Sequence, residues 1–563
     1  MAFATTMLVL LGIMTVMLFG AVGVGGGGLT TVMDNGLRMA SAHTDAVNAG
    51  ELAEAGVELT LAWLHAQSSP PSSTVPFAPS LWGGTASGSP QRTLVDYPVA
   101  GDASHQFSVI IYPSSTNGSG GDQEYMIESI GTSNAATRIV RAWVQTVSLC
   151  DYLYLSDNSS SAFWIDGVST FDGPVHCNNS NGNTTNIIWK TGSSQPMFLD
   201  TATNALTVSG SGILWCLNSP STQQIPQSTS DWSGIATSGQ SSVHVGTPVV
   251  PLPTSTTAEM NAALGGTTVP TQTGVTVPNG GLGLAPTGGI YIHGNVSQLT
   301  FTALPDINGS ESGQEITVSQ TGTAGLPLTT VIDIDPALDT TTYLSTQITS
   351  LLPLKLAGVY VGMPNGVIYC DGDIGSLSGT VYSGGVSGTI ADNEVTGGKV
   401  VHTTAWTIAT APTGLVAIDG NLEYNTQRQT SNGLPIAESS DSNFTLNAGT
   451  LGIVSGNIEI GAEDSGTTPT SVQVDAALLA LDTCEAADHS MTATGTFVSN
   501  GLFVTESTGS FGSVNSAGSL TSGYATTRHY DQRLQTSPPP DFPSYTGTYN
   551  VLSWRTATSL LDQ

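Results

Sequence analysis

Hydrophobic and polar positions divide the chain into stretches with different patterns. No charged residue occurs from Met1 to Met33, and Ala2–Val22 alone reaches the roughly 20 apolar residues that cross a bilayer core. From Leu37 to Gln67 apolar residues recur close to helical spacing. Beyond Gln106 short alternating runs predominate. The pattern predicts a long N-terminal α-helix followed by a mainly β head.

Glycines separate the two helical stretches. Six of them fall between Gly20 and Gly28, at Gly20, Gly23, Gly25, Gly26, Gly27 and Gly28. Each costs about 1 kcal/mol relative to alanine inside a helix. Lipid preserves the helix because nothing else satisfies its peptide groups, whereas the same segment can extend inside a protein bundle. We therefore expect an extended segment near residues 20–28.

The second helical stretch ends at Ser68, Ser69, Pro70 and Pro71. A Ser/Pro/Gly-rich linker follows, and then "QFSVIIYP", "EYMIESIGTS" and "TRIVRAWVQTVSL" are predicted as strands. We expect three parts: a helix over 1–67, a linker with a small β subdomain packed on that helix over 68–149, and a large head over 150–563.

A short phrase recurs in the head: alternating apolar residues, then Gly with Asn or Asp, then another apolar residue. It occurs at 289–296, 367–374, 415–422 and 451–458, with Gly294, Gly372, Gly420 and Gly456 as its glycines. Their spacing is irregular, so this is no clean solenoid repeat. We expect an irregular β-helix or layered β structure, with these glycines in turns that require positive φ.

Composition supports strands and turns and excludes some partners. The 563 residues include 66 glycines, and 9% are charged. With 11 basic and 42 acidic residues the formal charge is −31, which repels nucleic acid. No basic cluster is present for an anionic membrane surface.

Metal or cofactor chemistry has little support. The five cysteines, Cys150, Cys177, Cys216, Cys370 and Cys484, lack C-x-x-C spacing. Scattered buried thiols and one or two disulfides both remain open. The "DGD" at 371–373 provides too few carboxylates for a strong calcium site, and a turn is the better interpretation. We expect no cofactor and leave Ca²⁺ as a weak alternative.

No catalytic constellation stands out. His176 neighbours Cys177 without a second ligand at metal spacing, and G-x-S-x-G, H-E-x-x-H and P-loop motifs are absent. A polysaccharide lyase would need clustered basic residues, but Lys190, Lys355, Lys399 and Arg428 are dispersed. Among 42 acids, a carboxylate pair at glycosidase spacing arises by chance. We predict that the protein is not an enzyme.

The C-terminal tail combines prolines, aromatics and two of the few basic residues. Pro538–Pro540 cannot continue a ladder. We expect Arg528 and Arg533 to pair with carboxylates and lock the tail on the body. Packing by its aromatics would then cap the open end of the β stack. The predicted cap residues are Tyr530, Asp531, Arg533, Phe542 and Trp554, with Tyr549 beside them.

The N-terminal segment resembles the helix of the type IV pilin superfamily. "MAFATTMLVLLGIMTVMLFG" resembles the mature end of pilins and pilin-like proteins, whose basic leader is removed by prepilin peptidase. "AVNAGELAEAGVELTLAWL" resembles the second half of that helix in minor pilins with large heads. Thr5 and Thr6 stand where many major pilins carry a glutamate. A plain signal anchor is the alternative interpretation.

A second resemblance covers the head. "WIDGVSTFDGPVHCNN" (164–179) and the tail "HYDQRLQTSPPPDFPSYTGTYNVLSWRTA" (529–557) resemble a head domain of uncharacterised function in some bacterial pilus-assembly proteins. This resemblance implies a fold and a setting, but no activity.

Together the resemblances imply a structural subunit, major or minor, of a type IV-type filament outside the cell. The helix would sit in the inner membrane before assembly and then pack against other pilin subunits, identical or different. The implied core-packing residues are Phe3, Met7, Leu8, Leu11, Ile13, Met14, Met17 and Leu18. The alternatives are a membrane-anchored adhesin whose head binds surface glycans and an enzyme acting on cell-surface polysaccharide.

Overall fold

The fold comes from a computed structural model that describes most of the chain after residue 26. The described residues are 27–65, 92–99, 102–113, 124–157, 163–165, 169–178, 187–191, 197–200, 205–210, 214–217, 223–224, 232–233, 235–279, 284–305, 311–322, 325–336, 338–347, 354–382, 395–396, 399–400, 405–424, 430–431, 434–435, 449–461, 471–487, 489–490, 494–515, 520–535, 537–543 and 545–557.

The chain forms two compact units, and the second is inserted into the first. Unit 1 comprises Met1–Asn117, Gln123–Thr146 and Gly547–Gln563. Unit 2 comprises Gly118–Asp122 and Val147–Thr546. The last residues of the chain therefore belong with the N-terminal helix.

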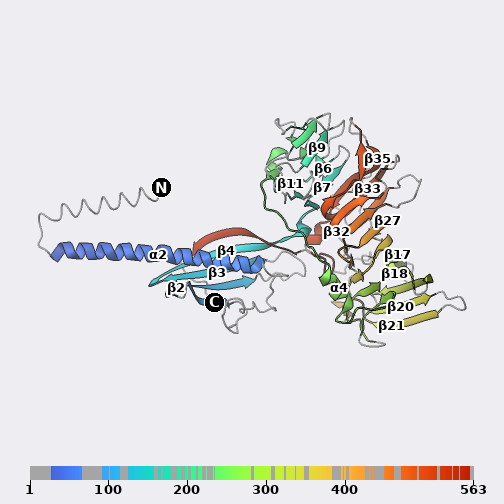
Figure 1. Cartoon of the computed structure of the whole chain (residues 1–563), viewed down its shortest axis with the longest axis horizontal. Helices are drawn as coiled ribbons and strands as arrows, with labels where there is room; N and C mark the ends of the chain where they lie inside the picture. The colour runs from blue at the N-terminus through green and yellow to red at the C-terminus, as the bar shows by residue number, and fades with distance from the viewer. Residues whose placement is uncertain are drawn as a thin grey trace. The chain divides into compact units, whose positions relative to one another are not determined.

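Unit 1 is a five-stranded sheet with one long helix on it (Figure 1). The helix α2 spans Gly27–His65 and contacts two central strands of the sheet. Strands one to four pair antiparallel in chain order, and the C-terminal strand lies beside the fourth. The strands are β1 (Arg92–Val99), β2 (Asp102–Pro113), β3 (Glu124–Ser133), β4 (Ala136–Ser148) and β36 (Tyr545–Ala557).

These elements follow from the local sequence. β2, β3 and β4 lie where the alternating runs predict them, and on β2 Phe107, Val109 and Ile111 are buried in alternation. The predicted helix 37–67 is observed as 27–65, because the helical backbone continues through Gly27 and Gly28. The helix ends before the predicted Ser/Pro stop.

Unit 2 is built on a long ladder of parallel strands, called here the first ladder. Every pairing along it is parallel, and the register is continuous apart from one shift between β32 and β33. In spatial order its strands are β14 (Val243–Val245), β11 (Leu206–Val208), β8 (Val175–Cys177), β5 (Tyr154–Ser156), β33 (Thr494–Thr508), β32 (Val472–Ala486), β30 (Leu451–Ser455), β26 (Trp406–Thr410), β22 (Val367–Cys370) and β16 (Ile290–His293).

A second parallel ladder shares β32 and β33 with the first. Its pairings are also parallel, and β31 (Asn457–Ile460) pairs with β27 and β32 alongside it. In order, its strands are β10 (Met197–Phe198), β7 (Thr170–Asp172), β35 (Leu520–Tyr530), β33, β32, β27 (Leu415–Tyr424), β23 (Ile374–Val381) and β17 (Val296–Pro305). Together the ladders form most of a mixed 23-stranded sheet.

The chain builds the first ladder in two runs that meet in its middle. Residues 154–245 add β5, β8, β11 and β14 in one direction. The chain then passes through α4 (Thr257–Leu264) to β16 at the opposite end. From there the second run returns to β33, which pairs with β5 in parallel.

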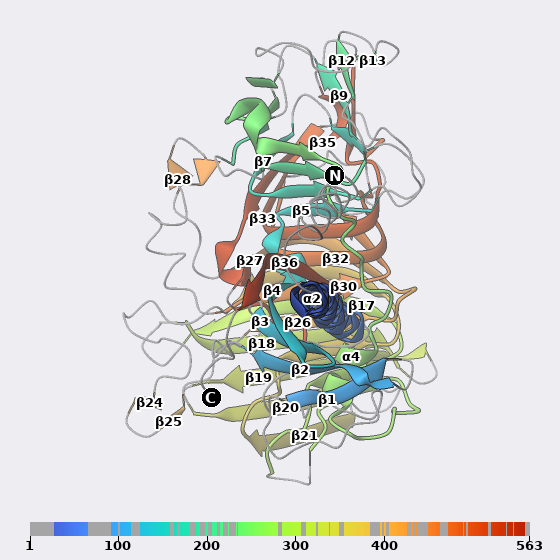
Figure 2. The ribbon, with the colours of Figure 1, turned by 90° about the vertical axis from the view of Figure 1, so that its left-hand side faces the viewer.

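Smaller elements branch from the ladders. An antiparallel meander extends from β17 through β18 (Glu311–Thr321), β19 (Pro327–Asp335), β20 (Thr340–Gln347) and β21 (Leu354–Val361) (Figure 2). A separate four-stranded sheet contains β6 (Phe163–Ile165), β9 (Ile187–Thr191), β12 (Leu214–Leu217) and β13 (Gln223–Gln224). The remaining elements are β15 (Gly274–Thr276), β24 (Val395–Thr396), β25 (Lys399–Val400), β28 (Thr430–Ser431), β29 (Leu434–Pro435), β34 (Gly512–Val514), η2 (Leu149–Asp151), η3 (Gly239–Ser242) and η6 (Gln532–Gln535).

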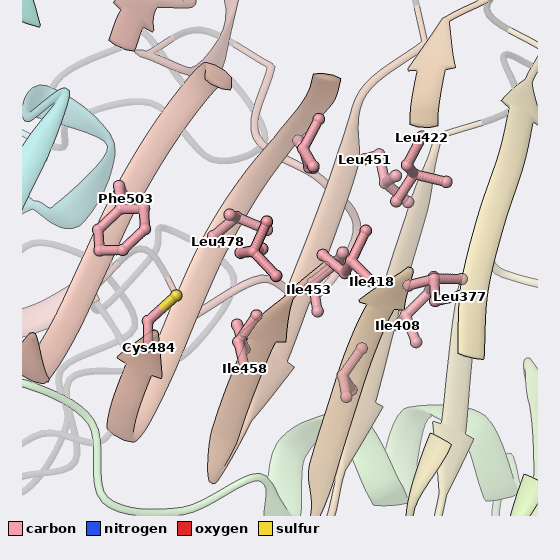
Figure 3. Packing of buried hydrophobic residues seen from close by; sticks show 14 of the residues in the cluster. Leu377, Ile408, Ile418, Leu422, Leu451, Ile453, Ile458, Leu478, Cys484 and Phe503 are labelled. Atoms are coloured by element: carbon pink, nitrogen blue, oxygen red, sulfur yellow. The ribbon is translucent and has the colours of Figure 1, made fainter. Parts of the chain in front are cut away.

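The strands of the first ladder from β8 to β16 are largely buried on both faces, whereas His244 and Val245 of the end strand β14 are exposed. In β26, Ile408 packs with the second ladder's Ile418 (Figure 3). Ala409 of the same strand belongs to a separate cluster on the other face. That outer cluster includes Leu264 of α4 and Phe542 of the tail. Burial on both faces explains why these strands are near-continuous apolar runs without clean alternation.

Only three of the four recurring phrases occupy equivalent places. Those starting at 289, 367 and 451 form β16, β22 and β30 of the first ladder. The phrase at 415–422 lies in β27 of the second ladder, and the equivalent first-ladder strand is β26. β26 itself is followed by an Ala–Pro–Thr–Gly turn, which has no Asn or Asp and so does not match the phrase.

The turn glycines serve two different purposes. Gly294 has φ +87°, as predicted. The predicted positive φ is wrong for Gly372, Gly420 and Gly456. Gly420 lies within β27, and the other two are needed for close approach. A Cβ on Gly372 would lie 2.4 Å from Oδ1 of Asn295, and one on Gly456 would lie 2.4 Å from the Pro412 carbonyl oxygen.

Candidate assembly interface

Residues 34–44 of α2 have no partner among the described residues over most of their surface. Residues 34–44 of the helix are all exposed, including Leu37 at 69% and Met39 at 75%. Arg38 and Asp34 form an exposed i,i+4 ion pair at 3.0 Å. Such a pair supports the helix by only about 0.3–0.5 kcal/mol. A long, exposed helix with apolar side chains is a surface available for packing against another molecule.

The C-terminal half of the same helix is held tightly on the sheet. Ala49, Ala53 and Val57 are fully buried against it. A Cβ on Gly131 of β3 would lie 2.0 Å from the Ala49 carbonyl oxygen, and one on Gly56 of α2 would lie 2.9 Å from the Phe107 ring. Glycine on each partner lets the two backbones approach closely. The helix therefore leaves the sheet from a rigid base.

A polar contact marks where the helix leaves the sheet. The Asn134 side-chain amide donates to Oδ1 of Asp45 at 2.9 Å. Asn134 sits in the β3–β4 turn with φ +51°, a conformation that asparagine tolerates well. Towards the N-terminus from Asp45 the helix is exposed, and towards the C-terminus it packs.

Aromatic contacts fix the other end of α2. His65 stacks on Tyr549 of β36 with ring centroids 5.6 Å apart, and Tyr125 of β3 meets the same ring at 5.9 Å. The Arg555 guanidinium lies 4.6 Å from the Trp143 ring centroid, which ties β36 to β4. The C-terminal strand thus helps to hold the N-terminal helix.

The predicted core-packing residues, Phe3 to Leu18, lie outside the described residues. So do Gly20, Gly23, Gly25 and Gly26 of the predicted extension segment. Gly27 and Gly28 form the start of α2. No helix among the described residues is both long enough and apolar enough to span a membrane.

The structure distributes the predicted tail-cap residues over two places. Arg533 pairs with Asp531 at 2.7 Å in unit 2, as expected. Tyr530 donates its hydroxyl proton to the Cys150 carbonyl. Phe542 packs on the flank of the first ladder, where a Cβ on Gly452 would lie 2.6 Å from its ring. Trp554 lies on β36 of unit 1, where it is 40% exposed.

Arg528 lies among aromatic rings inside unit 2, in a cage the sequence did not reveal. Its guanidinium carbon is 4.9 Å from the Phe503 centroid and 5.3 Å from that of Tyr154. Phe171, Phe497 and Phe511 complete this aromatic cage. The rings come from both runs of the ladder, so no local pattern could have indicated the cage.

The other candidate chemistry is structural. Asp371 of "DGD" accepts hydrogen bonds from Tyr291 at 3.1 Å and from the Gly294 amide at 2.7 Å, and its Oδ2 lies 2.5 Å from His293 Nδ1. Burial lowers the pKa of His176 to about 4. Among the described residues, no group of three or more His, Cys, Asp or Glu side chains could hold a metal ion. Cys150, Cys177, Cys370 and Cys484 are buried free thiols.

The comparisons with known proteins find likenesses among solved structures alone. No protein-family model matches the chain, and no curated protein matches it. Among solved structures, the chain is similar to the competence-associated pilin ComZ from Thermus thermophilus, with 13% identity over 91% of this chain and 98% of that one. The TM-score is 0.28. A superposition this loose transfers no role, so the residues of this chain carry the functional proposal.

Proposed function

We propose that this protein is a structural subunit of a type IV-type extracellular filament. In this proposal the N-terminal helix holds the chain in the membrane after synthesis and then packs with other pilin subunits in the filament core. The β-rich parts stay outside as the exposed head.

The observation that carries the proposal is the asymmetry of α2. The C-terminal part of the helix is fixed on a sheet by glycine contacts and aromatic stacking, whereas residues 34–44 are exposed. The exposed side chains of Leu37 and Met39 are unfavourable in water, because burial of apolar surface is worth about 25 cal/mol per Å². Packing against other helices would relieve this cost.

The insertion of unit 2 suits a subunit that displays a large head. The main segment of unit 2, Val147–Thr546, begins at the end of β4 and ends at the start of β36, and these two strands lie side by side in the sheet of unit 1. The helix-bearing unit is therefore complete without unit 2, and assembly contacts and head size can vary independently.

We further infer that unit 2 is a β-solenoid. The support is the parallel pairing along both ladders, which keeps its register apart from local shifts in β23–β27 and β32–β33, and the apolar core between them. A stack of this kind gives a rigid, acidic head that projects from the filament.

The first test changes the exposed half of α2. We expect Leu37→Asp to reduce the yield of sheared filaments at least about tenfold, because a charge would be placed in a desolvated helix contact. Val249→Asp is the matched control, since Val249 is 44% exposed in unit 2. Mass spectrometry of the sheared fraction measures both yields and shows whether the chain is a major or a minor component. Normal filaments from Leu37→Asp, at equal protein level, would count against the proposal.

A further inference from the structure

The strand β21 forms the free edge of the meander (Figures 1 and 2). Among the described residues it pairs with β20 alone, antiparallel over all eight residues and without a register shift. Its other edge therefore presents a row of backbone N–H and C=O groups that no described strand takes up.

This edge lacks the usual protection against pairing with another chain. Natural edge strands carry prolines, charges or bulges, or they are very short. The sequence of β21, "LKLAGVYV", has a single charge, Lys355, and no proline. The neighbouring β20, "TTTYLSTQ", has no charge at all. An unprotected edge of this length favours the addition of a further strand.

Aliphatic side chains are exposed along the same edge. Leu356, Val359 and Val361 are 61%, 59% and 60% exposed. Val359 and Val361 alternate with buried Tyr360, so they share the outer face of the sheet. Leu344 of β20 continues this face, since it lies opposite Ala357 in the register.

Charge favours a second copy of the chain as the occupant. Two copies with a formal charge of −31 each repel one another over most of their surfaces. The acids of the meander strands, Glu311 and Glu315 on β18 with Asp333 and Asp335 on β19, lie on strands further from the free edge, and Asp339 lies in the turn before β20. The only charge on β20 and β21 is basic. Two acidic copies therefore meet at this edge with the least repulsion.

We propose that β21 pairs antiparallel with β21 of a second copy and so forms a homophilic contact between heads. The contact is isologous: the same residues serve both partners, and a two-fold axis passes between the strands. It joins two five-stranded meanders into one continuous sheet and covers the aliphatic row on each.

Symmetry determines which copies can meet, and this step rests on the proposed filament function. A filament whose subunits all point the same way has no two-fold axis on its outer surface. An isologous pair therefore joins heads of two different filaments. The contact would bundle filaments or hold together cells that display them.

The primary experiment is sedimentation of the purified full chain in detergent micelles. We expect a discrete monomer–dimer equilibrium below about 100 µM, and we expect Val359→Lys to raise its dissociation constant at least about tenfold. The matched control, Val249→Lys, changes an exposed valine outside the meander (44% exposed, against 59% for Val359) and should leave the equilibrium unchanged.

A second measurement uses only the unaltered chain, so it does not depend on a variant that folds. Hydrogen exchange should show amides of 354–361 becoming protected as the protein concentration rises, while those of β36 do not change. Three results would overturn the proposal: the unaltered chain remains a monomer at about 100 µM, it forms polydisperse aggregates, or the Val359→Lys variant dimerises as tightly as the unaltered chain.

Electron microscopy separates this inference from the filament proposal. Unaltered filaments should lie side by side, and Val359→Lys should give equal filament yield without bundles. Bundles that persist in the variant would overturn the inference and leave the filament function standing. Absence of filaments from the unaltered chain would count against the filament function, while sedimentation would still decide the β21 contact.

Discussion

Single buried polar side chains tune the stability of unit 2. Glu259 of α4 is 1% exposed, and its Oε2 has no hydrogen-bond partner among the described residues. Burial, with a smaller contribution from Asp541, raises the pKa of this carboxyl to about 7. The folded chain therefore favours the protonated form of Glu259, whereas the unfolded chain titrates it near 4.5.

The raised pKa predicts a stability that falls as pH rises. The contribution of Glu259 is fully present below pH 4.5 and is lost as pH rises through about 7, a change of about 3 kcal/mol. Glu259→Gln keeps a neutral side chain at every pH. Thermal unfolding from pH 5 to pH 8 should show the variant gaining a few degrees over the unaltered chain towards pH 8. A constant gap between the two would contradict the assignment.

At the scale of elements, the sequence pattern located helix and strands but not how closely they pack. The apolar spacing that predicts α2 and the alternation that predicts β2–β4 are both local. The close contact between α2 and β3 depends on Gly131, which the pattern treats as an ordinary strand residue. Gly131 of β3 faces the backbone of α2, and Gly56 of α2 faces the Phe107 ring of β2. Neither segment alone shows that these glycines meet another element.

The close packing around Gly131 predicts that adding one methyl group there strongly destabilises unit 1. Gly131→Ala would place Cβ against the α2 backbone, so the helix must shift, and unit 1 should lose about 1–3 kcal/mol. Gly50→Ala in α2 is the control, because nothing lies within 4 Å of its Cβ. That change should stabilise the helix by about 0.5–1 kcal/mol. Urea unfolding followed by fluorescence measures both, and equal effects would show that the contact is not tight.

At the scale of the whole molecule, two features connect distant parts of the chain. β36 joins the sheet that carries the N-terminal helix, and β33 joins β5 across the meeting point of the two runs. The aromatic cage around Arg528 lies at this meeting point. Tyr154 and Phe171 belong to the first run, and Phe497, Phe503 and Phe511 belong to the second.

The cage predicts that Arg528 holds the two runs together. Cation–π contacts contribute up to about 2 kcal/mol each when desolvated, so Arg528→Met should lower the unfolding temperature of unit 2. It should also increase limited proteolysis within 154–245. Arg138→Met, which changes an exposed arginine of unit 1, should have an effect within about 0.5 kcal/mol. If the two variants have the same unfolding temperature, the aromatic cage does not stabilise the contact between the two runs of the ladder.

The sequence by itself determined what depends on neighbours a few residues apart. Helical spacing located α2, alternation located β2–β4, and composition indicated an acidic, strand-rich head. The pairing of Arg533 with Asp531 also followed from proximity along the chain.

Only the tertiary structure decided which strands lie side by side. Backbone hydrogen bonds are the same for every pair of parallel strands, so they do not depend on which strand is the partner. The pairing of β33 with β5, and the place of β26 between β22 and β30, therefore could not be deduced from the residues of these strands. For the same reason Trp554 was assigned to the tail cap, yet it lies on a strand of unit 1. The free edge of β21 likewise became visible only once every neighbouring strand had a place.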